Sequence, residues 1–473
     1  MENYVNLLFG LFGGVLFSHA ANAANPDREK PNIILIMADD LGYAHLGCYG
    51  QLKIKTPNID RLALEGIRFT QAYAGGPVCT PSRSVLMTGF HNGHTPARDN
   101  VPHYPSYLKE EDLTVAEVLR EAGYQCSGVG KWSLGDAGTV GAATNQGFDR
   151  WFGYLNQDHA HYYYPEYLDE SDRPESEFRL ELPGNTENRN HYSHELIAGR
   201  ALQYIRDSHT EPFFLYAAFT LPHFSAGSED KDRFTVPSTD PYSGMDWDEK
   251  SKKYAAMIHI LDTDVGRIVH LVDSLGLKEN TLIIFTSDNG GHSEVSRMFD
   301  TNNPFRGFKG DLTEGGIRVP LIARWPGKIP AGKTTPEVFA FQDILPTFAQ
   351  LTGGRIPENT DGISMVNALR GKKQKEKHSF LYWDTGHCRE RYDQAVRMGK
   401  WKGIRTGQEE NIQLYNLNKD IGEKNNLADR YPEIISIIET EMIQAYTPNE
   451  NYPIGKKYTG SPIWKKGNQT IKH

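Results

Sequence analysis

The sequence predicts an α/β protein: a large, mostly parallel sheet covered by helices on both faces, then a smaller C-terminal domain of antiparallel sheet plus one helix. Apolar runs rich in β-branched residues alternate with segments of helical period, a pattern typical of parallel strands joined by helices. The first run, NIILIMA at residues 32–38, is typical of a strand buried on both faces. Short apolar runs after about residue 363 predict the second sheet.

The elements of the large domain can be justified in order. A helix is expected at residues 114–123, because Thr114 and Glu117 have the spacing of a capping box and Gly123 can end it. Further helices are predicted at 194–206 and 252–275, and further strands at 124–129, 213–219 and 282–286. Helix and strand therefore alternate along this part of the chain.

The smaller domain has a different pattern. Short strands are predicted at 380–383, 394–397, 401–405 and 412–417, and a final helix at 432–446. Short strands with a tight turn between them favour antiparallel pairing. We expect an N-terminal catalytic domain over residues 24–362, and a C-terminal subdomain with its tail over residues 363–473.

The first residues have the pattern of a secretory signal. An apolar core spans residues 7–17, and Ala-Asn-Ala at 21–23 fits the small-x-small cleavage rule. We expect a signal peptide at residues 1–23 and an exported protein, periplasmic or extracellular. The apolar run is too short to span a bilayer, so stable membrane insertion is not expected.

Charge and cysteine content exclude some classes of protein. The 473 residues carry a net charge of −9, with a pI near 6.0. Such a chain lacks the overall basic field that attracts nucleic acid, so no nucleic-acid partner is expected and any positive charge that binds an anion must be local. The four cysteines form no disulfide framework for a protein of this size.

Polar residues follow four of the predicted strands. They are Asp39, Asp40, Lys131, His223, Asp288 and Asn289. In sheets of this kind, ligands bind outside the carboxyl ends of the strands. The acids and the amide offer only oxygen donors, which is the ligand set of a hard cation, calcium before magnesium. A solvated turn is the alternative for the Asp39-Asp40 pair alone.

Two lysines and a histidine supply chemistry that complements the acids. Lys131 and Lys309 both lie in glycine-flanked strings, where the backbone can approach a ligand closely. Two such lysines would admit sulfate or phosphate beside an acidic metal site. His223 is suited to give a proton to a leaving alcohol near neutral pH. Surface lysines and a structural histidine are the alternatives.

Cys79 is the candidate reactive residue. Thr80 as N-cap and Pro81 at the first helical position predict a helix over residues 82–88. Cys79 would then project from a helix N-terminus, where backbone N–H groups favour an anion and Arg83 adds a guanidinium suited to an oxyanion. A buried cysteine without chemistry is the alternative.

Nine short strings, taken together, resemble one family. They are CTPSR at 79–83, ADDLGY at 38–43, VGKW at 129–132, FGYLNQ at 152–157, LPH at 221–223, TSDNG at 286–290, EGGIRVP at 314–320, DILPT at 343–347 and LYNL at 414–417. In this order they resemble the formylglycine-dependent type I sulfatases of the alkaline phosphatase superfamily. The resemblance covers nearly the whole mature chain and implies a two-domain α/β fold with a calcium site.

The resemblance also implies residue roles. Cys79 would be oxidised to formylglycine by a separate maturation enzyme. Calcium would be held by Asp39, Asp40, Asp288, Asn289 and residue 79, and sulfate by Arg83, Lys131, His223 and Lys309. One hydroxyl of hydrated formylglycine would attack sulfur while the alcohol leaves with a proton from His223 or a neighbour; the second would expel sulfate, which a thiol cannot do.

Two positions depart from the family pattern. Ser133 occupies the place of the histidine that is usually set against the formylglycine hydroxyl, so Ser133 takes its place among the candidate catalytic residues. His159, His161 and His292 are candidates to replace that histidine. The second departure is Ala-His at residues 44–45 in place of Gly-Asp, which we interpret as peripheral to the metal.

The substrate is less determined than the reaction. Export favours a sulfated carbohydrate, of algal galactan or glycosaminoglycan type. Candidate residues for a sugar pocket are Arg98, Asn100, Gln157, His159, His161 and the tyrosines at 162–164, although the tyrosines are equally consistent with packing. The alternatives are a formylglycine-dependent phosphonate monoester or phosphodiester hydrolase, and a non-catalytic protein that binds sulfated glycans, which only Ser133 favours.

Overall fold

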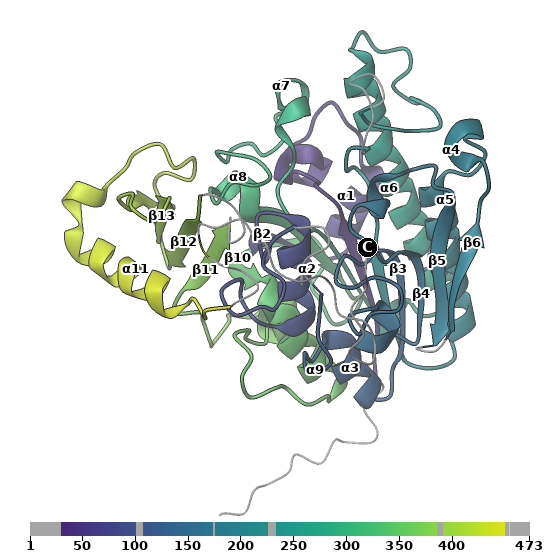
Figure 1. Cartoon of the computed structure of the whole chain (residues 1–473), viewed down its shortest axis with the longest axis horizontal. Helices are drawn as coiled ribbons and strands as arrows, with labels where there is room; N and C mark the ends of the chain where they lie inside the picture. The colour runs from purple at the N-terminus through teal and green to yellow at the C-terminus, as the bar shows by residue number, and fades with distance from the viewer. Residues whose placement is uncertain are drawn as a thin grey trace, which may run out of the picture.

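The computed structural model describes residues 30–100, 107–173, 176–225, 233–385, 391–449 and residue 454. These residues form a large ten-stranded sheet with helices on both faces and a separate four-stranded sheet (Figure 1). The predicted signal peptide lies outside the described residues. Within the described part of the chain, none of the helices has the length and apolar character needed to cross a membrane.

The ten-stranded sheet has a parallel centre. In spatial order its strands are β10 (Lys333–Ala340), β2 (Ile67–Tyr73), β9 (Arg318–Arg324), β8 (Thr281–Ser287), β1 (Asn32–Ala38), β7 (Phe213–Ala218), β3 (Gln125–Lys131), β4 (Arg150–Tyr154), β5 (Tyr167–Arg173) and β6 (Ser176–Glu181). The strands from β8 to β4 are parallel, while β9 and β5 join them antiparallel. The mostly parallel sheet is thus confirmed.

Strand β1 explains why the sheet is covered on both faces. All seven of its residues are buried, and successive side chains enter different cores because side chains alternate along a strand. Ile34 and Ile36 pack in one core with α1 (Pro57–Leu64), α5 (Ser193–Ser208) and α6 (Glu249–Ser274). Leu35 and Met37 pack in the other with α2 (Cys79–Thr88), α3 (Val115–Glu121) and α9 (Ile344–Thr352).

The predicted helices are present with shifted ends. The capping box of α3 is confirmed, since Thr114 Oγ1 accepts the Glu117 N–H at 3.2 Å and Glu117 Oε2 accepts the Thr114 N–H at 2.8 Å. The prediction for α2 was wrong at its start, because the helix begins at Cys79 and Thr80 is not its N-cap. The remaining short helices are α4 (Asn185–Asn188), α7 (Ser296–Phe299), α8 (Glu314–Ile317) and α10 (Val366–Leu369).

The smaller sheet matches the predicted architecture. Its strands β11 (Leu381–Thr385), β12 (Asp393–Met398), β13 (Trp401–Thr406) and β14 (Gln413–Asn416) are all antiparallel. Helix α11 (Pro432–Gln444) packs on this sheet through Ile438 and Met442. The predicted boundary between residues 362 and 363 stays a prediction.

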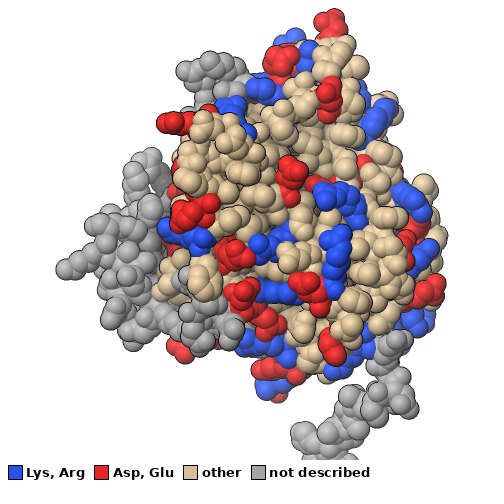
Figure 2. All heavy atoms as spheres, turned by 90° about the vertical axis from the view of Figure 1, so that its right-hand side faces the viewer, with Lys and Arg blue, Asp and Glu red and all other residues tan. Residues whose placement is uncertain are grey.

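Surface charge is mixed. On the face shown in Figure 2, which includes the β5–β6 side of the molecule, basic and acidic side chains are interspersed. Interspersed charges of this kind produce no extended basic field on that face.

Candidate active site

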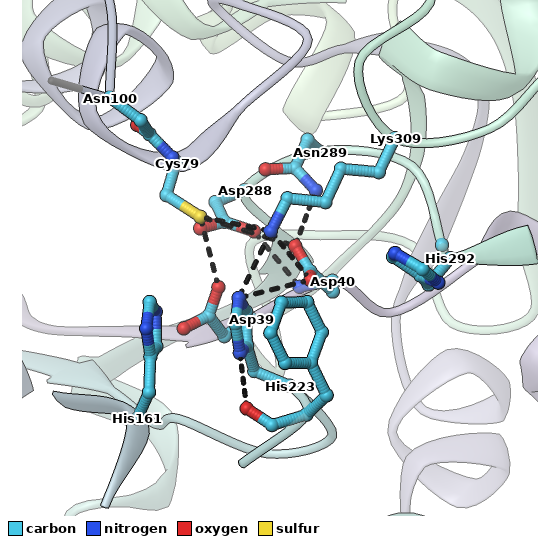
Figure 3. Close-up of polar contacts among 12 residues, drawn as sticks. Asp39, Asp40, Cys79, Asn100, His161, His223, Asp288, Asn289, His292 and Lys309 are labelled. Atoms are coloured by element: carbon cyan, nitrogen blue, oxygen red, sulfur yellow. Dashed lines mark hydrogen bonds and ion pairs between the residues drawn. The ribbon is translucent and has the colours of Figure 1, made fainter. Parts of the chain in front are cut away.

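The strand order brings the predicted polar residues to one edge of the sheet. Strands β8, β1, β7 and β3 are neighbours, and the residues that follow them meet at their carboxyl ends. Ala38 is paired with Ser287, so Asp39 and Asp288 follow at the same level. Figure 3 shows Asp39, Asp40, His223, Asp288 and Asn289 around one centre, with Cys79 and Lys309 reaching it from other elements.

The acids and the amide form a buried, mutually bonded group. All four side chains are at most 2% exposed. Asn289 Nδ2 donates to Asp40 Oδ1 at 2.7 Å, and the Asp40 N–H donates to Asp288 Oδ1 at 3.1 Å. Asn289 Oδ1 has no hydrogen-bond partner among the described residues. A buried amide oxygen beside three carboxylates fits the ligand set of a hard cation.

Cys79 lies directly against this group. In the first turn of α2, its Sγ is 3.4 Å from Asp39 Oδ1 and 3.6 Å from Lys309 Nζ, and its side chain is fully buried. Burial, followed by the negative charge of Asp39, raises the pKa of the Cys79 thiol to about 12. The helix begins early because Thr80 has other partners: its N–H donates to Asn100 Oδ1 at 2.7 Å and its hydroxyl to Gln157 Oε1 at 3.2 Å.

Each carboxylate has a basic partner. Lys131 Nζ lies 2.8 Å from Asp39 Oδ2, and Lys309 Nζ lies 2.7 Å from Asp40 Oδ2. Arg83 Nη2 donates to Asp288 Oδ2 at 2.8 Å, and Arg83 Nη1 to the Lys131 carbonyl at 2.6 Å.

The basic partners set the charge of the acids. Burial alone would raise the pKa of Asp39, yet Lys131, then His223, Arg83 and Lys309, hold it well below its ordinary value. The site therefore combines ionised carboxylates with three cationic side chains in one buried volume.

His223 is held in one orientation. Its Nδ1–H donates to the Phe224 carbonyl at 2.7 Å, which leaves Nε2 facing Asp40 Oδ2 at 3.3 Å and Lys309 Nζ at 3.0 Å. The ring of His161 stacks on it with centroids 4.0 Å apart and 2° between the planes. Burial, then the charge of Lys309, lowers the pKa of His223 to about 4.

Ser133 lies two residues after the end of β3. Its hydroxyl is buried and has no hydrogen-bond partner among the described residues, and its φ of 67° lies in the left-handed region. Of the three candidate replacement histidines, His161 borders the site, with Nε2 3.4 Å from Lys131 Nζ. His292 lies on the opposite side of the group (Figure 3), and His159 packs on Tyr167.

The other predicted positions divide between the site and its surroundings. Asn100 and Gln157 border the site through Thr80. Arg98 points elsewhere, because its guanidinium donates to the Thr95 and Thr447 carbonyls. His45 is fully buried and its Nδ1 accepts hydrogen bonds from Gly42 N and the Tyr254 hydroxyl, both at 3.1 Å, which agrees with a peripheral place.

Two neighbours of His223 were missed by the sequence reasoning. Tyr163, named only as a sugar-pocket candidate, donates its hydroxyl to the Thr220 carbonyl at 2.8 Å and the His223 carbonyl at 2.7 Å. Phe224 supplies the carbonyl that fixes the His223 tautomer. The sequence did offer one signal for Phe224, because this residue directly follows the candidate histidine.

Comparison with known proteins identifies the family. A family model described as Sulfatase matches residues 31–354, more than half of the chain. The chain belongs to the sulfatase family. A second model, described as the C-terminal part of N-sulphoglucosamine sulphohydrolase, matches residues 309–447.

Named relatives of this sulfatase agree with that assignment. Arylsulfatase A of Homo sapiens is 32% identical, over 87% of this chain and 87% of the relative. N-acetylgalactosamine-6-sulfatase of Canis lupus familiaris is 29% identical, over 91% of this chain and 88% of the relative. The solved structure of Ps i-CgsB in complex with k-i-k-neocarrahexaose has a TM-score of 0.75 and 29% identity, and covers 91% of this chain and 95% of that one.

Proposed function

We propose that this sulfatase removes sulfate from a sulfated carbohydrate, with residue 79 as formylglycine and calcium bound by Asp39, Asp40, Asp288 and Asn289. One observation carries the proposal: the fully buried Cys79 lies within 3.6 Å of both Asp39 and Lys309. A cysteine there stands between the candidate metal ligands and a candidate sulfate-binding lysine, where a nucleophile of this reaction has to be.

The residues present fit calcium. Besides residue 79, the four proposed ligands offer oxygen atoms, and Asn289 Oδ1, which has no partner among the described residues, is an acceptor that a cation would satisfy. When bound, calcium would polarise a hydroxyl on residue 79 and neutralise an oxygen of the sulfate. A formylglycine side chain, once hydrated, would supply the attacking hydroxyl and a second one that expels sulfate.

The chain's own side chains would do the remaining work. Lys131 and Lys309 would bind sulfate oxygens, since each extends an ammonium group into the site between carboxylates. Arg83 would hold Asp288 in place and add positive charge. The protonated form of His223 would give its Nε2 proton to the leaving alcohol and return to the neutral Nδ1–H form, because Nδ1–H stays bonded to the Phe224 carbonyl.

A carbohydrate substrate is supported by relatives rather than by a pocket in this chain. One relative is named for N-acetylgalactosamine-6-sulfate, and one similar structure holds a neocarrahexaose. Both galactan and glycosaminoglycan substrates therefore stay open. The sulfatase matches do not favour the phosphonate or phosphodiester alternative.

Maturation and export complete the proposal. Conversion of Cys79 requires an enzyme that oxidises this cysteine, which would be a transient partner of the chain. Periplasmic or extracellular location rests on the signal pattern at residues 1–23.

The test is the mass of the tryptic peptide that contains residue 79, measured beside sulfate release from a panel of sulfated sugars. Protein produced with a maturation enzyme should show a loss of about 18 Da at Cys79, the difference between thiol and aldehyde, together with sulfate release. Cys79→Ala should abolish release, while Cys126→Ala, which alters another fully buried cysteine, should retain it. An unmodified thiol with glycan binding but no release would leave the binding-protein alternative.

A further inference from the structure

Four side chains are in successive contact beside the site. The His161 and His223 rings are parallel at 4.0 Å, the Phe224 ring follows at 4.3 Å from His223 with a tilt of 35°, and the Arg233 guanidinium lies 3.6 Å from the Phe224 centroid. The Phe224 ring therefore contacts both the candidate proton donor and a cation. Neither the Phe224 ring nor Arg233 has a place in the mechanism above.

Arg233 is itself fixed. Its Nε and Nη2 lie 3.0 and 2.8 Å from Glu294 Oε1, and its carbonyl accepts the Ser225 N–H at 2.7 Å. That backbone bond attaches Arg233 to the segment that carries His223 and Phe224. The Arg233 side chain is 25% exposed and that of Glu294 is 21% exposed, so solvent reaches the Arg233 end of this group.

Phe224 holds His223 in two ways. Its carbonyl accepts the His223 Nδ1–H, which fixes the tautomer, and its ring lies against the His223 ring with centroids 4.3 Å apart. Because the His223 ring contacts both the His161 ring and the Phe224 ring, it cannot tilt without displacing a neighbour. The direction of His223 Nε2 toward the reaction centre therefore depends on whether Phe224 keeps its place, and the Arg233 guanidinium packs over the Phe224 ring.

We propose that Arg233, acting through Phe224, is a positioning residue for His223 in sulfate ester hydrolysis. The inference rests on the proposed function, because it assigns to His223 the proton given to the leaving group. A cation over the face of an aromatic ring attracts the ring electrostatically, so Arg233 restrains Phe224 more strongly than an apolar side chain of similar length would.

The test compares two esters with the matured enzyme. Nitrophenyl sulfate releases a good leaving group that needs no proton, whereas a sugar sulfate releases an alcohol that does. The variants are Arg233→Met, Arg233→Lys and Phe224→Leu, which keeps the backbone carbonyl. Arg150→Met is the matched control, because Arg150 also lies over an aromatic ring, Tyr204 at 4.2 Å, has an acid partner, Asp207 at 3.5 Å, and is 21% exposed.

General acids contribute about 10²- to 10⁴-fold to such reactions. Arg233→Met and Phe224→Leu should therefore lower kcat for the sugar sulfate by about ten-fold, with KM and nitrophenyl sulfate turnover little changed. Arg233→Lys should recover most of the loss, and Arg150→Met should show none.

A second readout does not use activity. In protein labelled with ¹⁵N-histidine, the hydrogen-bonded Nδ1–H signal of His223, assigned with His223→Gln, should exchange faster with solvent in Arg233→Met. Equal losses on both esters, or an unchanged Nδ1–H signal, would overturn the inference alone. Absence of sulfate release from either ester by the matured unsubstituted enzyme would overturn the proposed function and this inference with it.

Discussion

Calcium binding to this protein should depend on pH, with an affinity about ten-fold weaker at about pH 5 than at about pH 7.5. The reason lies in Asp288, one of the proposed ligands, which is fully buried. Burial, and then the neighbouring Asp39, raise the pKa of Asp288 from an ordinary value of 3.8 to about 6, although Arg83 opposes the shift. Calcium binds the ionised carboxylate, so below about pH 6 it must displace one proton.

The magnitude follows from linkage. Because the folded-state pKa of Asp288 lies above its ordinary value, the stability it contributes is fully present below pH 3.8 and is lost as the pH rises through about 6. A shift of about two pKa units corresponds to about 3 kcal/mol. One displaced proton weakens binding ten-fold per pH unit below 6, which is about 1.4 kcal/mol at about pH 5.

Isothermal titration with calcium at the two pH values measures the effect, and thermal unfolding gives a second reading. At a calcium concentration about 100 times Kd, stabilisation is about 2.7 kcal/mol, or about 3 °C for a chain of this size. Asp288→Asn should bind calcium more weakly than the unsubstituted protein, and its calcium affinity should not depend on pH. The control is Asp262→Asn, which changes a buried acid that accepts hydrogen bonds from Asn58 and Ile59 away from the site. This variant should keep both the calcium affinity and its pH dependence. Equal affinity at the two pH values would refute the reasoning.

Three further predictions concern single side chains. Lys131→Met leaves Asp39 buried without its closest basic partner, so the free energy of unfolding, measured by denaturant titration, should fall by about 3–5 kcal/mol. The initial rate of sulfate release should fall more than about ten-fold. Ser133→Ala removes a buried hydroxyl with no partner among the described residues, and should leave kcat within about two-fold and stability unchanged or higher by about 1 kcal/mol; a large loss of kcat would show a direct role. Burial opposes the shift, but Lys402 and then Arg318 hold the pKa of Glu314 at about 2. Because this value lies below the ordinary 4.5, Glu314 contributes about 3 kcal/mol to the free energy of unfolding above pH 4.5, and this contribution is lost as the pH falls toward 2. Urea unfolding of Glu314→Gln at the same pH values should not show that loss.

The sequence could predict the members of the site better than their arrangement. Asp39 and Asp288 each follow an apolar run, so their place at strand ends is a local property. Their proximity depends on β8 pairing with β1, a long-range contact that no local pattern specifies. Lys309 lies in a loop away from any predicted strand, so only the glycine-flanked string and the family resemblance indicated it.

Tertiary contacts also account for what the sequence reasoning missed. Thr80 followed by Pro81 is a good helix-start signal, yet Asn100 and Gln157 satisfy Thr80 from other segments, and the helix begins at Cys79. Strands β5 and β6 are rich in charged residues and extend the sheet through pairing with β4, which composition does not indicate. The contact of Arg233 with Phe224 likewise goes with a backbone bond from Ser225 N–H to the Arg233 carbonyl, which no local pattern specifies.

The surroundings of Cys79 bear on how the proposed reaction can occur. Burial and Asp39 keep its thiol protonated at neutral pH, and the thiolate is the nucleophilic form of cysteine. A neutral thiol is also a poor ligand for a hard cation, which prefers oxygen. An oxygen function on the same side chain would meet both needs, since it would face the same carboxylates and Lys309 without requiring a thiolate. The charges around residue 79 thus suit the proposed oxidised side chain better than the protonated thiol.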